Sequence, residues 1–232
     1  MAYDFNGTSH YMWTTHDGSS SASPLTSLPL TIACWFKVFT SSFPKSTSRV
    51  LLEFGNGTTG YRLVIPANQT FLRAVHFISA GAQPADTIAS PSFPPDAWVF
   101  GAAIFASNAS RSVFACYPFG GDLIVNQNTN TQSLGSATIS RFSIGAASAL
   151  TTNYFDGSVA EVGVWNAALN TQDLLSIGRG VAYSKVRPNS LVLYAPLIRN
   201  TNTLFYKQSL ASLPYYIANT GASTTEHPRI YL

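Results

Sequence analysis

The chain has 232 residues, a length that fits one large β-sandwich or two small domains. Hydrophobic residues make up 46% and aromatic residues 13%, enough for a sizeable core, whereas charged residues make up only 10%, against about 25% in an average soluble domain. The formal net charge is +3 and the basic residues are scattered singly from Lys37 to Arg229, so no cluster predicts a nucleic-acid partner.

The chain opens directly on a strand-like pattern, from Ala2 onward. No basic segment followed by an apolar one is visible there, so we expect no ordinary secretory signal. No run approaches the roughly 20 apolar residues of a membrane-spanning helix, so we expect no membrane partner. Ser, Thr, Asn and Gln must supply the polar surface, which suits an extracellular or particle-exterior protein better than a cytosolic enzyme.

Short apolar runs separated by turn signals recur along the chain, a pattern typical of strands. In the first long run, Leu30 to Phe39, we expect alternate residues from Ile32 to Val38 on one face and Ala33, Trp35 and Lys37 on the other. The other predicted strands are Val50 to Phe54, Tyr61 to Ile65, Phe71 to Ile78, Trp98 to Phe105, Ser112 to Tyr117, Leu123 to Val125, Ile139 to Ile144, Val159 to Trp165 and Ser190 to Leu197.

Turn-forming residues fill the gaps. Asn56-Gly57 and the segment Ser107 to Ser110 lie where hairpins would turn. Gly18 to Pro24 and the proline-containing stretch Ala80 to Pro95 are predicted loops. The sequons at Asn6, Asn56, Asn68 and Asn108 are interpreted as turn formers rather than glycosylation sites.

One segment predicts a helix. Asn170 or Thr171 can cap its start, Asp173 lies in the first turn, where the helix dipole favours an anion, and Gly178 or Gly180 can end it. It would be a short surface helix on an otherwise β protein.

The cysteines, Cys34 and Cys116, each lie within an apolar strand-like run. Two buried free thiols are the expected arrangement, and a disulfide between two strands stays open as the alternative.

The segment Phe155 to Gly180 reads FDGSVAEVGVWNAALNTQDLLSIGRG. It resembles the closing strand and helix of laminin-G-like, concanavalin-A-like domains, and Asp4 to Gly7, Pro95 to Trp98 and Leu191 to Leu197 resemble further landmarks in family order. The resemblance covers about residues 2 to 198. It implies an all-β, two-sheet antiparallel jelly-roll sandwich over residues 1–199, with residues 200–232 as a C-terminal tail packed on the sandwich or projecting from it.

Strand alternation within this segment predicts which residues share a surface. Val162 and Val164 are expected on one surface of the sheet, and Val159, Glu161 and Trp165 on the other.

Catalysis is not predicted. The glucanase branch of the resembled superfamily carries E-x-D-x-x-E on one strand, and the glutamates here, Glu53, Glu161 and Glu226, do not complete it. Asp156 and Glu161 have the outer spacing, but Ser158 stands between them, and hydrolysis of a glycoside needs two suitably placed carboxyl groups. The histidines show no metal-type spacing, and no nucleophile elbow or phosphate-binding loop occurs.

Calcium is a possible cofactor implied by the resemblance, because several relatives bind it at one rim of the sandwich. The candidate ligands are Asp122, Asn126, Asn153 and Asp156, of which Asp122 and Asp156 carry a negative charge. Calcium takes six to eight oxygen ligands, and no acidic cluster surrounds either residue in the sequence, so Asp156 is interpreted first as a turn former.

Carbohydrate binding would need exposed aromatic side chains beside hydrogen-bonding groups. The candidates at loops and strand ends are Trp13, Tyr61, Tyr117, Phe119 and Tyr154. Aromatic residues this numerous are usually part of the core, and the sequence does not distinguish the exposed ones.

The ending Glu226 to Leu232 resembles stand-alone laminin-G-like proteins encoded by tailed phages. We therefore expect a non-enzymatic virion surface protein, either a capsid decoration protein or a tail or fibre-tip module. Its expected partners are capsid or tail proteins, sister subunits in a homo-oligomer and host glycans. The alternative is a calcium-assisted lectin module of a cell-surface or secreted, and thus extracellular, protein.

Overall fold

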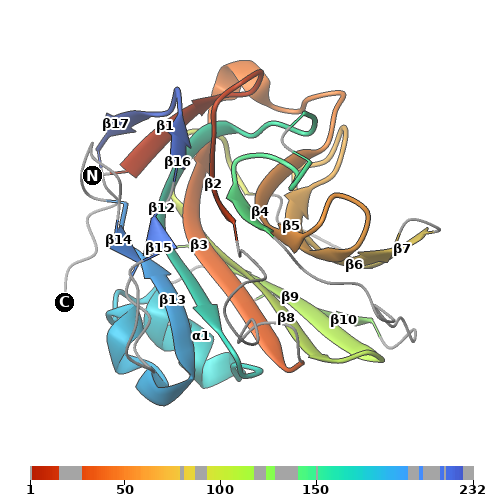
Figure 1. The fold of residues 1–232 in the computed structure, drawn as a ribbon, viewed down its shortest axis with the longest axis vertical. Coiled ribbons are helices and arrows are strands. Elements are labelled where there is room, and N and C mark those ends of the chain that lie inside the picture. Colours follow the sequence, from red (N-terminus) through yellow and green to blue (C-terminus); the bar gives the residue numbers. More distant parts are fainter. Residues whose placement is uncertain are drawn as a thin grey trace.

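Two antiparallel sheets stack face to face in this computed structural model, with one helix packed outside them (Figure 1). The residues that the structure describes are 2–15, 28–78, 81–86, 93–117, 124–128, 141–149, 151–197, 204–205, 215–216 and 218–226. No helix among them is long and apolar enough to cross a membrane.

Sheet A, the larger of the two, contains the three longest described strands of the fold, with 9, 9 and 10 residues. Its strands in spatial order are β10 (Ile124–Asn128), β9 (Ser110–Cys116), β8 (Val99–Ser107), β3 (Leu30–Val38), β12 (Asp156–Trp165), β1 (Ala2–Asn6) and β17 (Ser223–Thr225). A further strand, β13 (Leu191–Ala195), pairs with the second half of β12, beyond the half that pairs with β1. The returning strand therefore lies near the N-terminal strand, as the resemblance implied.

Sheet B covers the other side of the core. Its strands in spatial order are β16 (Ala218–Thr220), β2 (Tyr11–Thr15), β11 (Arg141–Ile144), β4 (Arg49–Gly55), β5 (Gly60–Ile65), β6 (Arg73–Ile78) and β7 (Gly81–Asp86). A separate two-stranded ladder joins β14 (Leu204–Phe205) to β15 (Tyr215–Tyr216). Single 3-10 turns lie at η1 (Thr40–Ser42), η2 (Tyr183–Lys185) and η3 (Pro188–Ser190).

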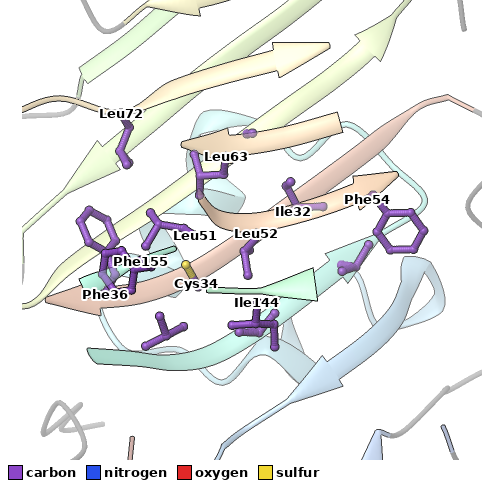
Figure 2. Packing of buried hydrophobic residues seen from close by; sticks show 14 of the residues in the cluster. Ile32, Cys34, Phe36, Leu51, Leu52, Phe54, Leu63, Leu72, Ile144 and Phe155 are labelled. Atoms are coloured by element: carbon purple, nitrogen blue, oxygen red, sulfur yellow. The ribbon is translucent and has the colours of Figure 1, made fainter. Parts of the chain in front are cut away.

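The main hydrophobic core fills the space between the sheets. Alternate residues of β3 from Ile32 to Val38 enter it, which confirms the predicted face of this strand. Figure 2 shows how β3 meets side chains from sheet B in this core, and it labels Ile32, Cys34, Phe36, Leu51, Leu52, Phe54, Leu63, Leu72, Ile144 and Phe155.

A second cluster covers the outer surface of sheet A. Ala33 and Trp35 of β3 belong to it, together with Leu174 and Ile177 of α1 (Thr171–Gly178). The helix begins as predicted, because the Asn170 side chain accepts a hydrogen bond from the backbone of Asp173 and the Asp173 carboxylate accepts one from the backbone of Asn170. The short helix thus closes one outer face of the sandwich.

The cysteines are free thiols buried on opposite sides of sheet A. Cys34 belongs to the core between the sheets and Cys116 to the cluster under the helix. Burial raises the pKa of the Cys34 thiol, and it raises the pKa of Cys116 to about 12. The expected pair of buried thiols is therefore confirmed.

Two local expectations are wrong. The predicted loop Ala80 to Pro95 contains strand β7, which pairs with β6 along its whole length. In β12 the register shifts between Ala160 and Gly163, and Glu161 adopts a positive φ of 48°. This bulge reverses the alternation, so Val159 enters the inter-sheet core with Val162 rather than facing away from it.

The end of the chain contributes to both sheets. Strand β16 pairs with β2 of sheet B, and β17 pairs with β1 of sheet A. Between them Ala222 is buried, and the Asn219 side chain bonds to its backbone nitrogen and oxygen. The turn between these two strands joins the two layers at the side where the first strands lie (Figure 1).

Candidate functional site

The outer face of sheet B carries the polar and aromatic side chains that do not enter the core. Met12 and Phe142 point into the core, so their strand neighbours, among them Trp13 and Arg141, point outward. On β4 and β5 the same alternation turns Glu53 and Arg62 outward, beside Val50 and Val64 of a small apolar cluster. Strand pairing places Trp13 beside Ser143, Ser143 beside Glu53, and Glu53 beside Arg62. These residues form one row across the sheet.

Glu53 is the buried centre of this row. Its Oε2 accepts a hydrogen bond from the Arg62 Nε at 2.5 Å, and its Oε1 accepts two bonds from Ser148, from the backbone nitrogen at 2.9 Å and from the hydroxyl at 2.6 Å. The Arg62 guanidinium also lies 4.1 Å from the centre of the Phe77 ring. Both carboxylate oxygens are therefore engaged, and they hold the loop around Ser148 onto the sheet.

Arg141 lies beside this network but does not join the carboxylate. Its guanidinium carbon lies 5.2 Å from the centre of the Trp13 ring, and its Nη1 donates to the Ser148 carbonyl oxygen. Its Nε is buried without a hydrogen-bond partner. The indole and the carbonyl thus hold a charged group in place at the surface of the sheet.

Three aromatic side chains, Tyr11, Trp13 and Tyr154, are half-buried, and the Trp13 ring is in contact with Arg141. Tyr11 and Trp13 stand two residues apart on β2 and so share the outer face. Tyr154 comes from the loop that precedes β12, and its ring centre lies 6.3 Å from that of Tyr11. We call these three residues, together with Arg141, the aromatic patch.

Two of the predicted sugar-binding residues, Trp13 and Tyr154, are linked through Tyr11, which shares a strand face with Trp13 and lies beside the Tyr154 ring. Tyr117 follows β9 and packs against the core between the sheets, so it lies away from the patch. Phe119 lies outside the described residues. Tyr61 is a core residue with only 2% exposure, so its proposed role as a loop aromatic is wrong.

Tyr11 and Arg141 were not predicted as site residues. The spacing of Tyr11 and Trp13 in the sequence was a usable signal for Tyr11, since residues two apart share a strand face. No local pattern signals Arg141, because it meets Trp13 only through the pairing of β2 with β11.

Of the predicted calcium ligands, Asp156 is the first residue of β12 and Asp122 lies outside the described residues. Asp156 faces basic groups: the Lys45 ammonium lies 3.9 Å from its Oδ2, and it acts electrostatically on Arg49. Burial lowers the pKa of Arg49 to about 10, and the negative charge of Asp156 opposes that shift. Across the described ranges, no three His, Cys, Asp or Glu side chains gather in a way that could hold a metal ion.

Glu161, which was considered with Asp156 as a catalytic carboxylate, lies at the bulge in β12. It accepts a hydrogen bond from the Tyr194 hydroxyl. Burial first, and then the negative charge of Glu161, raise the pKa of Tyr194. Ser158, the residue between Asp156 and Glu161 in the spacing noted above, donates to the Asp4 carboxylate at 2.6 Å. Each of these carboxylates is therefore engaged with a neighbour.

Comparison with protein families gives a match over residues 6–174 to the family described as the concanavalin A-like lectin/glucanases superfamily. The chain belongs to this superfamily. Its lectin-like fold consists of the two-sheet sandwich, with a bulge in β12 and a capped helix after that strand. A search of curated protein sequences gives no match.

Solved structures with low sequence identity share the fold of this superfamily member. A candidate carbohydrate-binding protein from Bacteroides ovatus aligns with a TM-score of 0.58 and 12% identity, over 96% of this chain and 58% of that one. The CBM40 domain of a Ruminococcus gnavus sialidase, solved with α2,3-sialyllactose, aligns with a TM-score of 0.53 and 16% identity. The alignment covers 77% of this chain and 97% of that one.

Tailspike protein 2 of the Escherichia coli O157:H7 bacteriophage CAB120 aligns with a TM-score of 0.53 and 15% identity, over 73% of this chain. This chain spans only 24% of the length of that tailspike. At such identities these likenesses concern the fold.

Proposed function

We propose that this chain is a non-catalytic carbohydrate-binding module whose ligand surface is the aromatic patch on sheet B. The observation that carries the proposal is the gathering of half-exposed Tyr11, Trp13 and Tyr154 with Arg141 on an outer sheet face. Aromatic rings bind the apolar faces of sugars, and a few fixed polar groups orient the ligand. The lectin-like superfamily and the carbohydrate-related neighbours support this proposal.

The engaged carboxylates support binding rather than hydrolysis. A glycosidase needs one carboxyl group to protonate the leaving group and a second to act as nucleophile or base. Near the patch, Glu53 is buried with both oxygens bonded to Arg62 and Ser148. Such a carboxylate is held as a structural anion, and we propose that the chain has no hydrolytic activity.

Binding without calcium follows from the same reasoning. Asp156 already faces Lys45 and Arg49, whose positive charges oppose a divalent cation at that position. We therefore propose a calcium-independent module rather than the calcium-assisted lectin considered above.

A virion surface is the proposed setting, with capsid or tail proteins and sister subunits as partners. The tailspike neighbour supports it, since a phage surface protein carries the same fold. Mass spectrometry of purified particles from the organism that encodes this chain tests the setting. Detection of the chain in particles is expected, whereas its absence from all particles and presence in the culture fluid would favour an extracellular lectin.

Substitution of Trp13 tests the binding surface. On a glycan array, the wild-type chain should bind a defined set of glycans equally well with and without a calcium chelator. Trp13→Ala should lose about 5- to 150-fold in affinity for them. One lost stacking contact accounts for about 1–3 kcal/mol. Trp98→Ala is the matched control, because Trp98 is half-buried over the other outer face.

Several outcomes would contradict the proposal. They are a blank array for the folded wild-type chain, binding that disappears with the chelator, and equal losses in the Trp13 and Trp98 variants. Thermal melting of each variant, and a Trp13→Phe variant that keeps an aromatic ring, separate loss of binding from loss of the fold.

A further inference from the structure

Arg141 holds a positive charge that the described part of the protein does not neutralise. A guanidinium has five N–H donors. One nitrogen donates to the Ser148 carbonyl oxygen, which is neutral, and the buried Nε has no partner. The other interaction of the group is with the Trp13 ring. None of these contacts is with an anion.

The carboxylate of Glu53, on the same sheet face, is bonded to other residues. Glu53 accepts from Arg62 with one oxygen and from Ser148 with the other, and among the described residues its ion pair is with Arg62 rather than with Arg141. This arrangement differs from that of Arg62, the neighbouring arginine of the same face, which has both a carboxylate and an aromatic ring as partners.

The described outward side chains of β4, β5 and β11, the strands beside the patch, carry more positive than negative charge. Arg62 and Arg141 point outward from β5 and β11, and Glu53 is the carboxylate among the described outward residues of these strands and β4. A net positive face with aromatic side chains attracts an anionic partner more strongly than a neutral one.

We propose that Arg141 binds the carboxylate of an acidic sugar, so that the ligand class of the patch is acidic glycans. This inference rests on the proposed function, because it assigns the ligand of the same surface. A planar guanidinium group can donate two parallel hydrogen bonds to the two oxygens of a carboxylate. Trp13 and the Ser148 carbonyl fix the guanidinium plane before the ligand arrives, which reduces the entropy lost on binding.

The test uses each probe glycan in two forms that differ only in the charge. The probes are α2,3-sialyllactose and a galacturonic acid trimer, each as the free acid and as its methyl ester, with lactose as a neutral reference. Calorimetry on the intact chain should show that at least one acid binds tenfold or more tightly than its ester. The preference should weaken at high salt, because part of it is electrostatic.

Two variants of Arg141 and one control variant test whether Arg141 causes the preference for the acid over its ester. Arg141→Gln should bring acid and ester within about twofold of each other, and Arg141→Lys should keep part of the preference, because it retains the charge without the planar fork. The charge control is Arg179→Gln, at an exposed arginine beyond the C-terminus of α1 on the other side of the sandwich, and it should bind like the wild type.

The outcomes separate the two proposals. Equal affinity of the wild type for acid and ester, or an unchanged preference in Arg141→Gln, would overturn the acidic-sugar inference while leaving glycan binding intact. Binding to none of the probes or to any array glycan would overturn the proposed function, and this inference with it. Thermal melting confirms that each variant is folded.

Discussion

Among single residues, His76 has an environment that the sequence did not reveal. Its side chain is only 1% exposed, its ring lies 4.8 Å from that of Tyr61, and both of its nitrogens are buried without a hydrogen-bond partner. Burial first, and then the positive charge of Arg111, lower the pKa of His76 to about 4 from an ordinary value of 6.5.

This depressed pKa predicts acid sensitivity. Since the unfolded chain takes up the proton first, the free energy of unfolding should be constant above pH 6.5 and fall as the pH decreases from 6.5 to 4. A pKa shift of this size corresponds to about 3 kcal/mol in the free energy of unfolding. Urea denaturation of wild type and His76→Gln across this range measures the difference, with His10→Gln as control. Parallel curves for the wild type and the His76 variant would contradict the assignment.

At the scale of elements, the strands with strict alternation and the capped helix were predictable. In β3 the two faces follow the period of two, and at α1 Asn170 and Asp173 sit where a capping box requires them. Strand β7 was missed because its Pro84 indicates a loop, yet β7 lies at the edge of sheet B, where a proline is tolerated. The bulge at Glu161 left no signal in the hydrophobic pattern, since one inserted residue reverses the alternation without changing composition.

The capping box predicts the effect of one substitution. Asn170→Ala removes the side chain that accepts from the Asp173 backbone and should lower the free energy of unfolding by about 1 kcal/mol. The exposed neighbour Thr171→Ala serves as a control with little expected change. Chemical denaturation checks both. Glycan binding should be unaffected, because α1 covers sheet A rather than the patch.

At the scale of the whole molecule, the two-sheet architecture was predictable and the patch was predictable only in part. The recurrent strands and the segment Phe155 to Gly180 indicated the sandwich, because local patterns carry that information. Arg141 meets Trp13 through strand pairing between segments that are far apart in the sequence. Register of this kind is set by the packing of both sheets, so no local window of the sequence contains it.

The arrangement of the layers gives the molecule two different outer faces. The helix lies over sheet A (Figure 1), where an apolar cluster packs beneath it. The outer face of sheet B presents arginine and aromatic side chains instead. The central claim is that the second of these faces binds glycans at the aromatic patch.

Mapping of the contact surface by NMR tests this claim most directly. A binding glycan from the array is titrated into isotope-labelled chain, and backbone and tryptophan indole signals are followed. The largest shifts are expected at Tyr11, Trp13, Arg141 and Tyr154, with the Trp13 indole signal moving and that of buried Trp165 unchanged. Shifts concentrated around α1 or on β8 and β9 would contradict it.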